Sequence, residues 1–141
     1  MSSDVQARRA VLGAEGRGRV SSGTVLAVAS FGAFLAFLDA TIVNVAFPSI
    51  RESFPDSTIS NLSWVLNAYN IVFAAFLVPF GRMSDLIGRR RAFVWGVLVF
   101  TVASVICALS PSVAFLVGAR VLQALGAAML VPASLALVVA A

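Results

Sequence analysis

The chain has 141 residues, of which 60% are hydrophobic and only 11% are charged, and its mean hydropathy is +1.00. A soluble domain carries roughly 25% charged residues, so this composition excludes an ordinary water-soluble globular protein. The net charge is +4 and all ten basic residues are arginines, but nine of these flank long apolar runs. That arrangement is typical of membrane topology and argues against a nucleic-acid partner.

The chain begins with a polar, basic segment, residues 1–23, which contains four arginines and predicts a cytoplasmic tail. The apolar run over residues 24–47 is interrupted by one charge, Asp39, and is long enough to cross a hydrocarbon core of about 30 Å. A cleaved signal peptide is the competing interpretation, but the run is too long, contains an acid and precedes further spans. Pro48 is predicted to end this span before a polar loop over residues 49–61.

Three more apolar runs follow, and they predict spans at residues 62–80, 92–109 and 113–132. The first two of these are joined by a charged loop over residues 81–91, and the last two by a tight uncharged turn at residues 110–112. We therefore predict an all-α membrane protein with four transmembrane helices.

The distribution of arginine predicts the orientation of these helices. The tail and the 81–91 loop carry four arginines each, the 49–61 loop carries one and the 110–112 turn carries none. Because short cytoplasmic segments are enriched in arginine, the tail, the 81–91 loop and the C-terminal end are expected in the cytoplasm. The sequence thus predicts a multi-pass protein of the cell membrane with a cytoplasmic N-terminus.

Two ionisable residues, Asp39 and Arg120, lie within predicted spans, where each is expected to cost about 2.5 to 3.5 kcal/mol. Counted from the outer ends of their spans, Asp39 lies about 12 Å deep and Arg120 about 10 Å deep. The matched depths predict a direct or water-mediated pair. The pair is interpreted either as a structural link between two helices or as a functional site in which the carboxyl group loads and releases a proton.

Other polar residues in the spans are candidate cavity-lining positions, although interhelical hydrogen bonds explain them equally well. These residues are Thr41, Asn44, Asn67, Asn70 and Gln123, and Tyr69 is a further polar position in the 62–80 span. The single cysteine, Cys107, is interpreted as a small buried hydrophobic residue. Since the chain has no histidine and one cysteine, we expect no metal site.

Three segments resemble motifs of the major facilitator superfamily, in its branch of 14-helix drug:proton antiporters. Leu38–Pro48 (LDATIVNVAFP) is similar to the signature of the first helix, and residues 81–91 are similar to the motif between helices two and three. Residues 120–128 (RVLQALGAA) are similar to the fourth-helix motif associated with proton coupling. Two positions depart from the pattern, because Leu86 replaces a basic residue and Ala124 replaces a glycine.

The resemblance implies that residues 24–141 form part of the N-terminal half of a facilitator fold, with Asp39 and Arg120 in proton coupling. It also implies a latch between the two halves of the transporter on the cytoplasmic side, and the alternative is that the loop arginines only fix topology. The residues of this loop motif are Gly81, Arg82, Asp85, Gly88, Arg89, Arg90 and Arg91.

The function implied by the resemblance is export of drugs or other small compounds, hydrophobic or cationic, in exchange for protons. The expected partners are the lipid bilayer, protons and the small-molecule substrate. No cofactor is expected, because the proton gradient supplies the energy. No enzyme activity is expected either, since the sequence shows no histidine, no nucleotide-binding loop and no paired carboxylates.

Four helices make up only part of such a transporter, whose substrate site lies between two six-helix halves. The isolated 141-residue chain is therefore expected not to transport. The alternatives are a facilitator for another metabolite and, from a different class, a non-transporting membrane fragment or an assembly partner. The coding sequence after codon 141 distinguishes these interpretations, because an in-frame continuation with further spans favours a transporter and a native stop codon favours a fragment.

Overall fold

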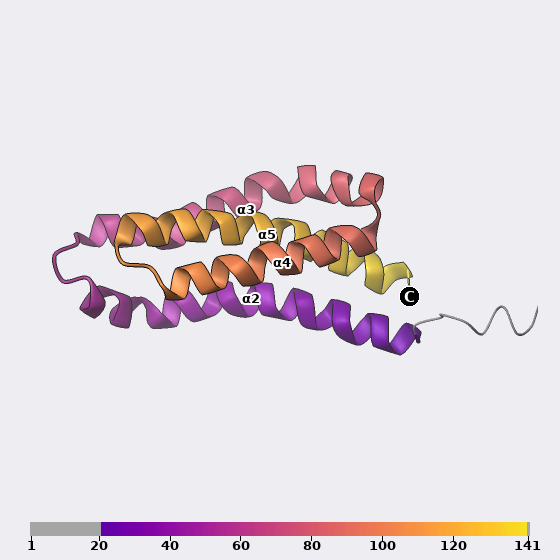
Figure 1. Ribbon diagram of the computed structural model, residues 1–141, viewed down its shortest axis with the longest axis horizontal. Coiled ribbons are helices and arrows are strands. Elements are labelled where there is room, and N and C mark those ends of the chain that lie inside the picture. The colour runs from indigo at the N-terminus through magenta and orange to yellow at the C-terminus, as the bar shows by residue number, and fades with distance from the viewer. Residues whose placement is uncertain (1–20, 141) are drawn as a thin grey trace, which may run out of the picture.

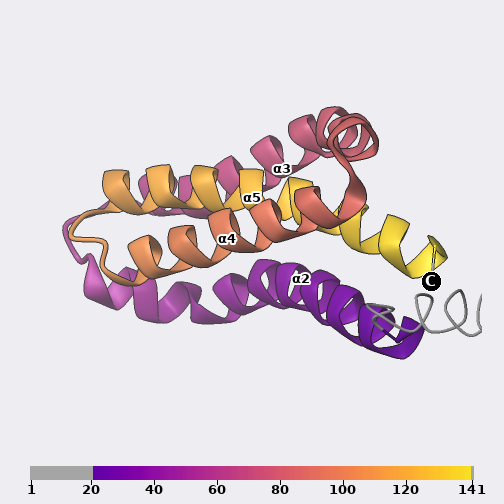
Figure 2. The same cartoon turned by 45° about the vertical axis from the view of Figure 1, so that its right-hand side comes forward.

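The computed structural model describes residues 21–140, so all but the last three residues of the predicted 1–23 tail lie outside it. In the described part of the chain there are four helices: α2 (Ser22–Ser53), α3 (Ile59–Ile87), α4 (Arg89–Ala108) and α5 (Val113–Ala140). They run alternately up and down one elongated bundle (Figure 1). The α2–α3 and α4–α5 connections lie together at one end, hereafter the two-loop end. The α3–α4 connection lies at the opposite end, hereafter the Gly88 end, and the turned view shows the same arrangement (Figure 2).

All four described helices are long and apolar enough to cross a membrane, with mean hydropathies from 1.5 to 2.0. The shortest, α4, has 20 residues and therefore extends about 30 Å, which matches a hydrocarbon core. Large apolar side chains such as Phe31, Phe34 and Phe37 on α2 are more than half exposed on the outside of the bundle. Lipid is the solvent that suits such a surface, and the predicted all-α membrane fold is confirmed.

The prediction that Pro48 ends the first helix is wrong. Helix α2 continues through Pro48 to Ser53, and the connection to α3 contains only residues 54–58. Pro48 is exposed, so its ring and the backbone carbonyl that it leaves unpaired face away from the helix contacts of the bundle. Beyond it, Phe54 N–H still donates to the Ile50 carbonyl at 3.2 Å, so regular helical pairing resumes.

The predicted 81–91 loop is also wrong in its extent, because all of these residues except Gly88 are helical. Gly88 has a φ of +98°, a conformation that glycine adopts without steric cost, and it reverses the chain within a single residue. Its N–H donates to the Ser84 carbonyl, and its own carbonyl accepts from Ala92 N–H, both near 3 Å. Gly81 does not mark a tight contact, since a methyl group there would meet Pro132 at an ordinary 3.7 Å.

Helix α5 lies at the centre and packs against the other three described helices. Its small residues Ala119, Ala124, Gly126, Ala127 and Ala128 are buried there, whereas Gly118 is exposed. The closest approach is to α4, because a Cβ built on Gly126 would lie 2.6 Å from the backbone nitrogen of Phe100. Ala124, which departs from the family motif, is fully buried in the core, so its methyl group is accommodated.

The start of α3 rests on a side-chain cap that can be tested. Thr58 Oγ1 accepts a hydrogen bond from Asn61 N–H at 3.2 Å. Replacing Thr58 with alanine should lower the free energy of unfolding by about 1 kcal/mol, because a helix-end donor loses its partner. Unfolding of the purified protein in mixed micelles measures this loss. The matched control is Ser60→Ala, within the first turn, which should be neutral or slightly stabilising; equal effects of the two changes would contradict the assignment.

Candidate functional site

The two charges predicted inside the membrane meet in the middle of the bundle. Arg120 on α5 donates from Nη1 to Oδ2 of Asp39 on α2 at a distance of 2.7 Å. The side chain of Arg120 is 3% exposed and that of Asp39 is 16% exposed. The matched depths allowed a direct or a water-mediated pair, and the structure shows the direct form, largely shielded from solvent by its neighbours.

Gln123, one helical turn after Arg120, links the pair to a third helix. Its amide nitrogen donates to Asp39 Oδ1 at 2.9 Å and to Ser104 Oγ on α4 at 2.8 Å. Its amide oxygen accepts from Arg120 Nη1 at 2.7 Å and from the Cys107 thiol at 3.6 Å. Both amide hydrogens and both oxygen lone pairs of this buried side chain are thus used. Gln123 holds both charged groups at fixed positions and ties them to α4.

The aromatic ring of Tyr69 provides a second support for the arginine. The central carbon of the Arg120 guanidinium lies 4.1 Å from the centroid of this ring, and Tyr69 is itself buried at 3% exposure. A cation over an aromatic face at this distance is attracted by the ring quadrupole. Because α3 supplies the ring, side chains from all four described helices surround the pair.

Sequence reasoning did not identify Ser104 as part of this site, and it noted Tyr69 only as a polar position. The spacing of three residues between Arg120 and Gln123 places them on one helix face and was the available signal for that pair. A serine in an apolar run gives no such signal, because its hydroxyl commonly bonds its own backbone, as Ser104 does with the Phe100 carbonyl at 2.9 Å. Cys107 is half-buried beside the site and is not the core residue that was predicted.

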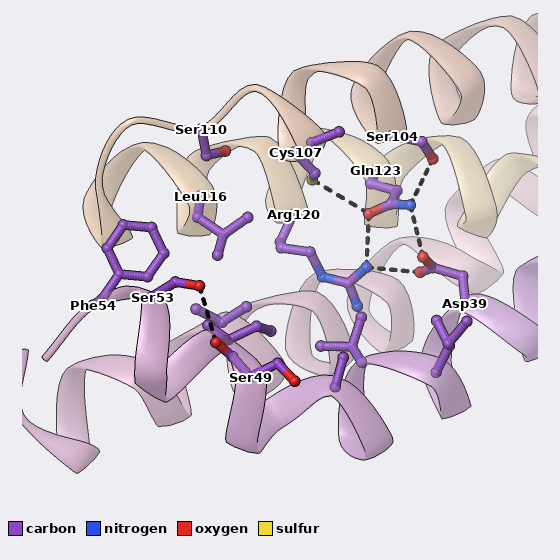
Figure 3. Close-up of a pocket in the computed structure, with 16 residues that line it drawn as sticks. Asp39, Ser49, Ser53, Phe54, Ser104, Cys107, Ser110, Leu116, Arg120 and Gln123 are labelled. Carbon is purple, nitrogen blue, oxygen red and sulfur yellow. Dashed lines mark hydrogen bonds and ion pairs between the residues drawn. The ribbon is translucent and has the colours of Figure 1, made fainter.

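A cavity of about 650 Å³ adjoins the ion pair and extends from it toward the two-loop end (Figure 3). Asp39, Arg120 and Gln123 form its deep wall, and Ser53, Phe54 and Ser110 line it near the loops. Its polar lining residues come from α2, α4, α5 and the α4–α5 connection. The cavity is therefore large enough for water molecules to approach the ionisable pair.

The other predicted cavity-lining residues lie elsewhere. Thr41 and Asn44 are exposed on α2, where their side chains donate to the carbonyls of Phe37 and Ala40 in the same helix. Asn67 and Asn70 are exposed on α3, and none of the four polar residues lines this cavity. Of the predicted set, the structure brings only Gln123 to the ion pair.

The predicted cytoplasmic motif gathers at the Gly88 end, far from the ion pair along the helices. Arg89 lies 3.6 Å from Asp85 across one helical turn interrupted by Gly88, and both side chains are well exposed. Arg89 Nη1 also donates to the Ala136 carbonyl near the end of α5 at 3.2 Å. This contact ties the α3–α4 turn to the last turns of α5, where a cation also interacts favourably with the helix dipole.

Within residues 21–140 no group of three or more histidine, cysteine, aspartate or glutamate side chains is placed to hold a metal ion. The polar cluster around Arg120 contains one carboxylate, one amide, one hydroxyl and one thiol, arranged around a fixed cation. Its chemistry suits a proton-binding carboxylate whose partner retains its charge.

Comparison with known proteins identifies relatives across nearly the whole described bundle. The family described as the Major Facilitator Superfamily matches residues 29–141. The methylenomycin A resistance protein of Streptomyces coelicolor is 40% identical over 94% of this chain and 28% of its own length. The multidrug resistance protein Stp of Mycobacterium tuberculosis is 46% identical over 82% of this chain and 21% of its own. The riboflavin transporter RibZ of Clostridioides difficile is 34% identical over 81% of this chain and 25% of its own. The chain therefore spans less than a third of the length of these relatives.

Proposed function

Because the chain belongs to the major facilitator superfamily, we propose that it supplies the N-terminal membrane helices of a proton-coupled exporter of small organic compounds. The observation that supports this proposal most directly is the buried ion pair of Asp39 and Arg120 beside a cavity. An ionisable pair at mid-span is costly to place there and is characteristic of ion and substrate pathways.

Asp39 is the member of the pair that exchanges protons, since a guanidinium does not lose its charge in a protein. When Asp39 takes up a proton, it loses its charge and its attraction to Arg120. Arg120 then keeps two supports that do not depend on this charge, the amide oxygen of Gln123 at 2.7 Å and the ring of Tyr69. The arginine therefore stays in place while the carboxyl group cycles, as a reversible proton site requires.

The bundle is oriented in the cell membrane with its Gly88 end on the cytoplasmic side. Arg82, Arg89, Arg90 and Arg91 all belong to this end, whereas Arg51 is the single arginine near the two-loop end among residues 21–140. Such an asymmetry is the usual topology signal of membrane proteins. The exposed side chains of Asp85 and Arg89 can then form ion pairs with another part of a complete transporter, and these ion pairs would hold its two halves together on the cytoplasmic side.

The substrates are drugs or other small compounds, by analogy with the relative named a multidrug resistance protein. The resemblance to drug:proton antiporters implies that these compounds are hydrophobic or cationic. The proton gradient is the energy source, no cofactor takes part, and the protein is not an enzyme. A second candidate is transport of another metabolite, because one relative is named a riboflavin transporter. Both functions use the same proton site and differ in the compound carried.

Export is tested in cells that express the native reading frame, including any residues encoded after Ala141, and that are preloaded with the cationic dye ethidium or with riboflavin. We expect expressing cells to lose ethidium faster than control cells, and we expect nigericin, which collapses the pH gradient, to remove the difference. Faster loss of riboflavin alone would favour the second candidate. Equal loss of both compounds with and without expression would contradict the proposal for these substrates.

A further inference from the structure

The amide group of Gln123 contacts both members of the ion pair, and it can do so in only one orientation. Its oxygen accepts from Arg120 Nη1 at 2.7 Å, and its nitrogen donates to Asp39 Oδ1 at 2.9 Å. A reversed amide would place its oxygen against the carboxylate and its nitrogen against the cation. The last torsion of a glutamine side chain is intrinsically broad, so hydrogen bonds decide which way the amide faces.

Ser104 on α4 supplies a contact to this amide that involves no charge. Its Oγ atom lies 2.8 Å from the amide nitrogen of Gln123 (Figure 3) and 2.9 Å from the Phe100 carbonyl oxygen. A serine hydroxyl has one hydrogen, and the carbonyl can only accept, so this hydrogen is donated to Phe100. Toward Gln123 the hydroxyl presents a lone pair, to which only the nitrogen of the amide can donate. Ser104 thus distinguishes the two ends of the amide.

The packing of α4 against α5 holds Ser104 at this distance from Gln123. Gly126 lies one turn after Gln123 on α5, and Phe100 lies one turn before Ser104 on α4. A Cβ built on Gly126 would lie 2.6 Å from the backbone nitrogen of Phe100, so the two backbones are in direct contact there. Small residues permit such close approach between membrane helices. The contact between Ser104 and Gln123 therefore does not depend on the charge of Asp39.

An amide group is planar, so two fixed contacts define the direction of its remaining N–H. With the oxygen on Arg120 and one N–H on Ser104, the other N–H is directed at Asp39. Protonation of Asp39 weakens its own hold on this N–H, because a neutral acceptor forms weaker hydrogen bonds than a carboxylate. We propose that Ser104 is a positioning residue of the proton site, which keeps the amide nitrogen of Gln123 directed at Asp39 while the proton is bound and released. The role in proton exchange rests on the proposed function, whereas the orientation of the amide does not.

Efflux kinetics test this role in cells that express the native reading frame. Ser104→Ala should lower the maximal rate of ethidium efflux, per amount of protein in the membrane, about fivefold, the ratio that one lost hydrogen bond supplies. The half-saturating ethidium concentration should not change, because Ser104 acts on the proton site. Ser104→Thr should restore the rate, since threonine keeps the hydroxyl and the adjoining cavity has room for its methyl group. The matched control is Ser63→Ala, which should have no effect, because Ser63 bonds only the Ile59 carbonyl of its own helix among the described residues.

Infrared difference spectra of the purified protein at two pH values test the same role without transport. The carboxyl C=O band of Asp39 is the one that Asp39→Asn removes. Hydrogen bonds lower the frequency of this band, so Ser104→Ala should raise it, as Gln123→Met does, and Ser104→Thr should restore it. In the Gln123→Met background, Ser104→Ala should cause no further shift, since the residue through which it acts is gone.

Three results would overturn the positioning role of Ser104. These are an unchanged maximal efflux rate in Ser104→Ala, an effect on the half-saturating concentration alone, and an Asp39 band that does not move or that moves equally in both backgrounds. A spectrum without any Asp39 band would overturn it as well, together with proton exchange at this residue. The expected infrared shifts without efflux of either compound by the parent protein would count against the proposed function alone.

Discussion

Replacing Asp39 with asparagine should abolish proton-coupled efflux and lower the free energy of unfolding by about 3 kcal/mol, because the buried charge of Arg120 loses its counter-charge. The value lies at the low end for a broken buried pair, since the asparagine oxygen can still accept from Nη1 and Asp39 is not fully buried. Loss of ethidium from preloaded cells measures efflux, and unfolding in mixed micelles measures stability.

A double variant separates a structural role of this pair from a role in coupling. Asp39→Asn combined with Arg120→Gln removes both charges, so most of the lost stability should return while efflux stays absent. Glu52→Gln is the matched control, because Glu52 is also an acid on α2 but is exposed near the two-loop end. It should change neither quantity. Recovery of efflux in the double variant would show that the pair only holds α2 and α5 together.

The second large effect is expected at the contact between α4 and α5. Gly126→Ala should lower the free energy of unfolding by about 1 to 3 kcal/mol, because the added methyl group overpacks a filled interface. Its Cβ would lie 2.6 Å from the nitrogen and 2.9 Å from the Cα of Phe100, so backbone has to move to admit it. Unfolding of the purified variant in mixed micelles measures the loss.

Gly118→Ala is the control on the same helix, since a Cβ there meets nothing within 4 Å. It should be neutral or stabilise the protein by about 0.5 to 1 kcal/mol, because alanine loses less backbone entropy than glycine in a helix. Similar losses for both variants would mean that α4 and α5 do not pack at this distance in the membrane.

The sequence was sufficient to predict the four helices and the meeting of Asp39 with Arg120. Long runs of apolar residues indicate helices that lie in lipid, and the depth of a residue in the membrane follows from counting residues along its helix. The sequence did not predict the continuation of α2 through Pro48. Pro48 lies on the exposed face of α2, where its ring meets no neighbouring helix, and which face of a helix lies outward depends on the tertiary structure.

The details of the site depend on side-chain directions that no linear pattern contains. Tyr69 and Asn70 are adjacent in the sequence, yet only Tyr69 is buried against Arg120 while Asn70 is exposed. Likewise, Ser104 joins the network because α4 approaches α5 closely, and that approach depends on glycines on both helices. Which polar residues meet is decided by helix rotation and packing, whereas the sequence specifies only that they are present.

The most direct test of the central claim, that Asp39 is the proton-coupling group, is proton movement driven by substrate. The protein encoded by the native reading frame is reconstituted in vesicles containing a pH-sensitive dye, and ethidium, or whichever compound the cell assay identifies, is added to one side. The account predicts substrate-dependent proton movement in the opposite direction for the parent protein and none for Asp39→Asn. Equal substrate-driven proton flux in the two proteins would contradict it.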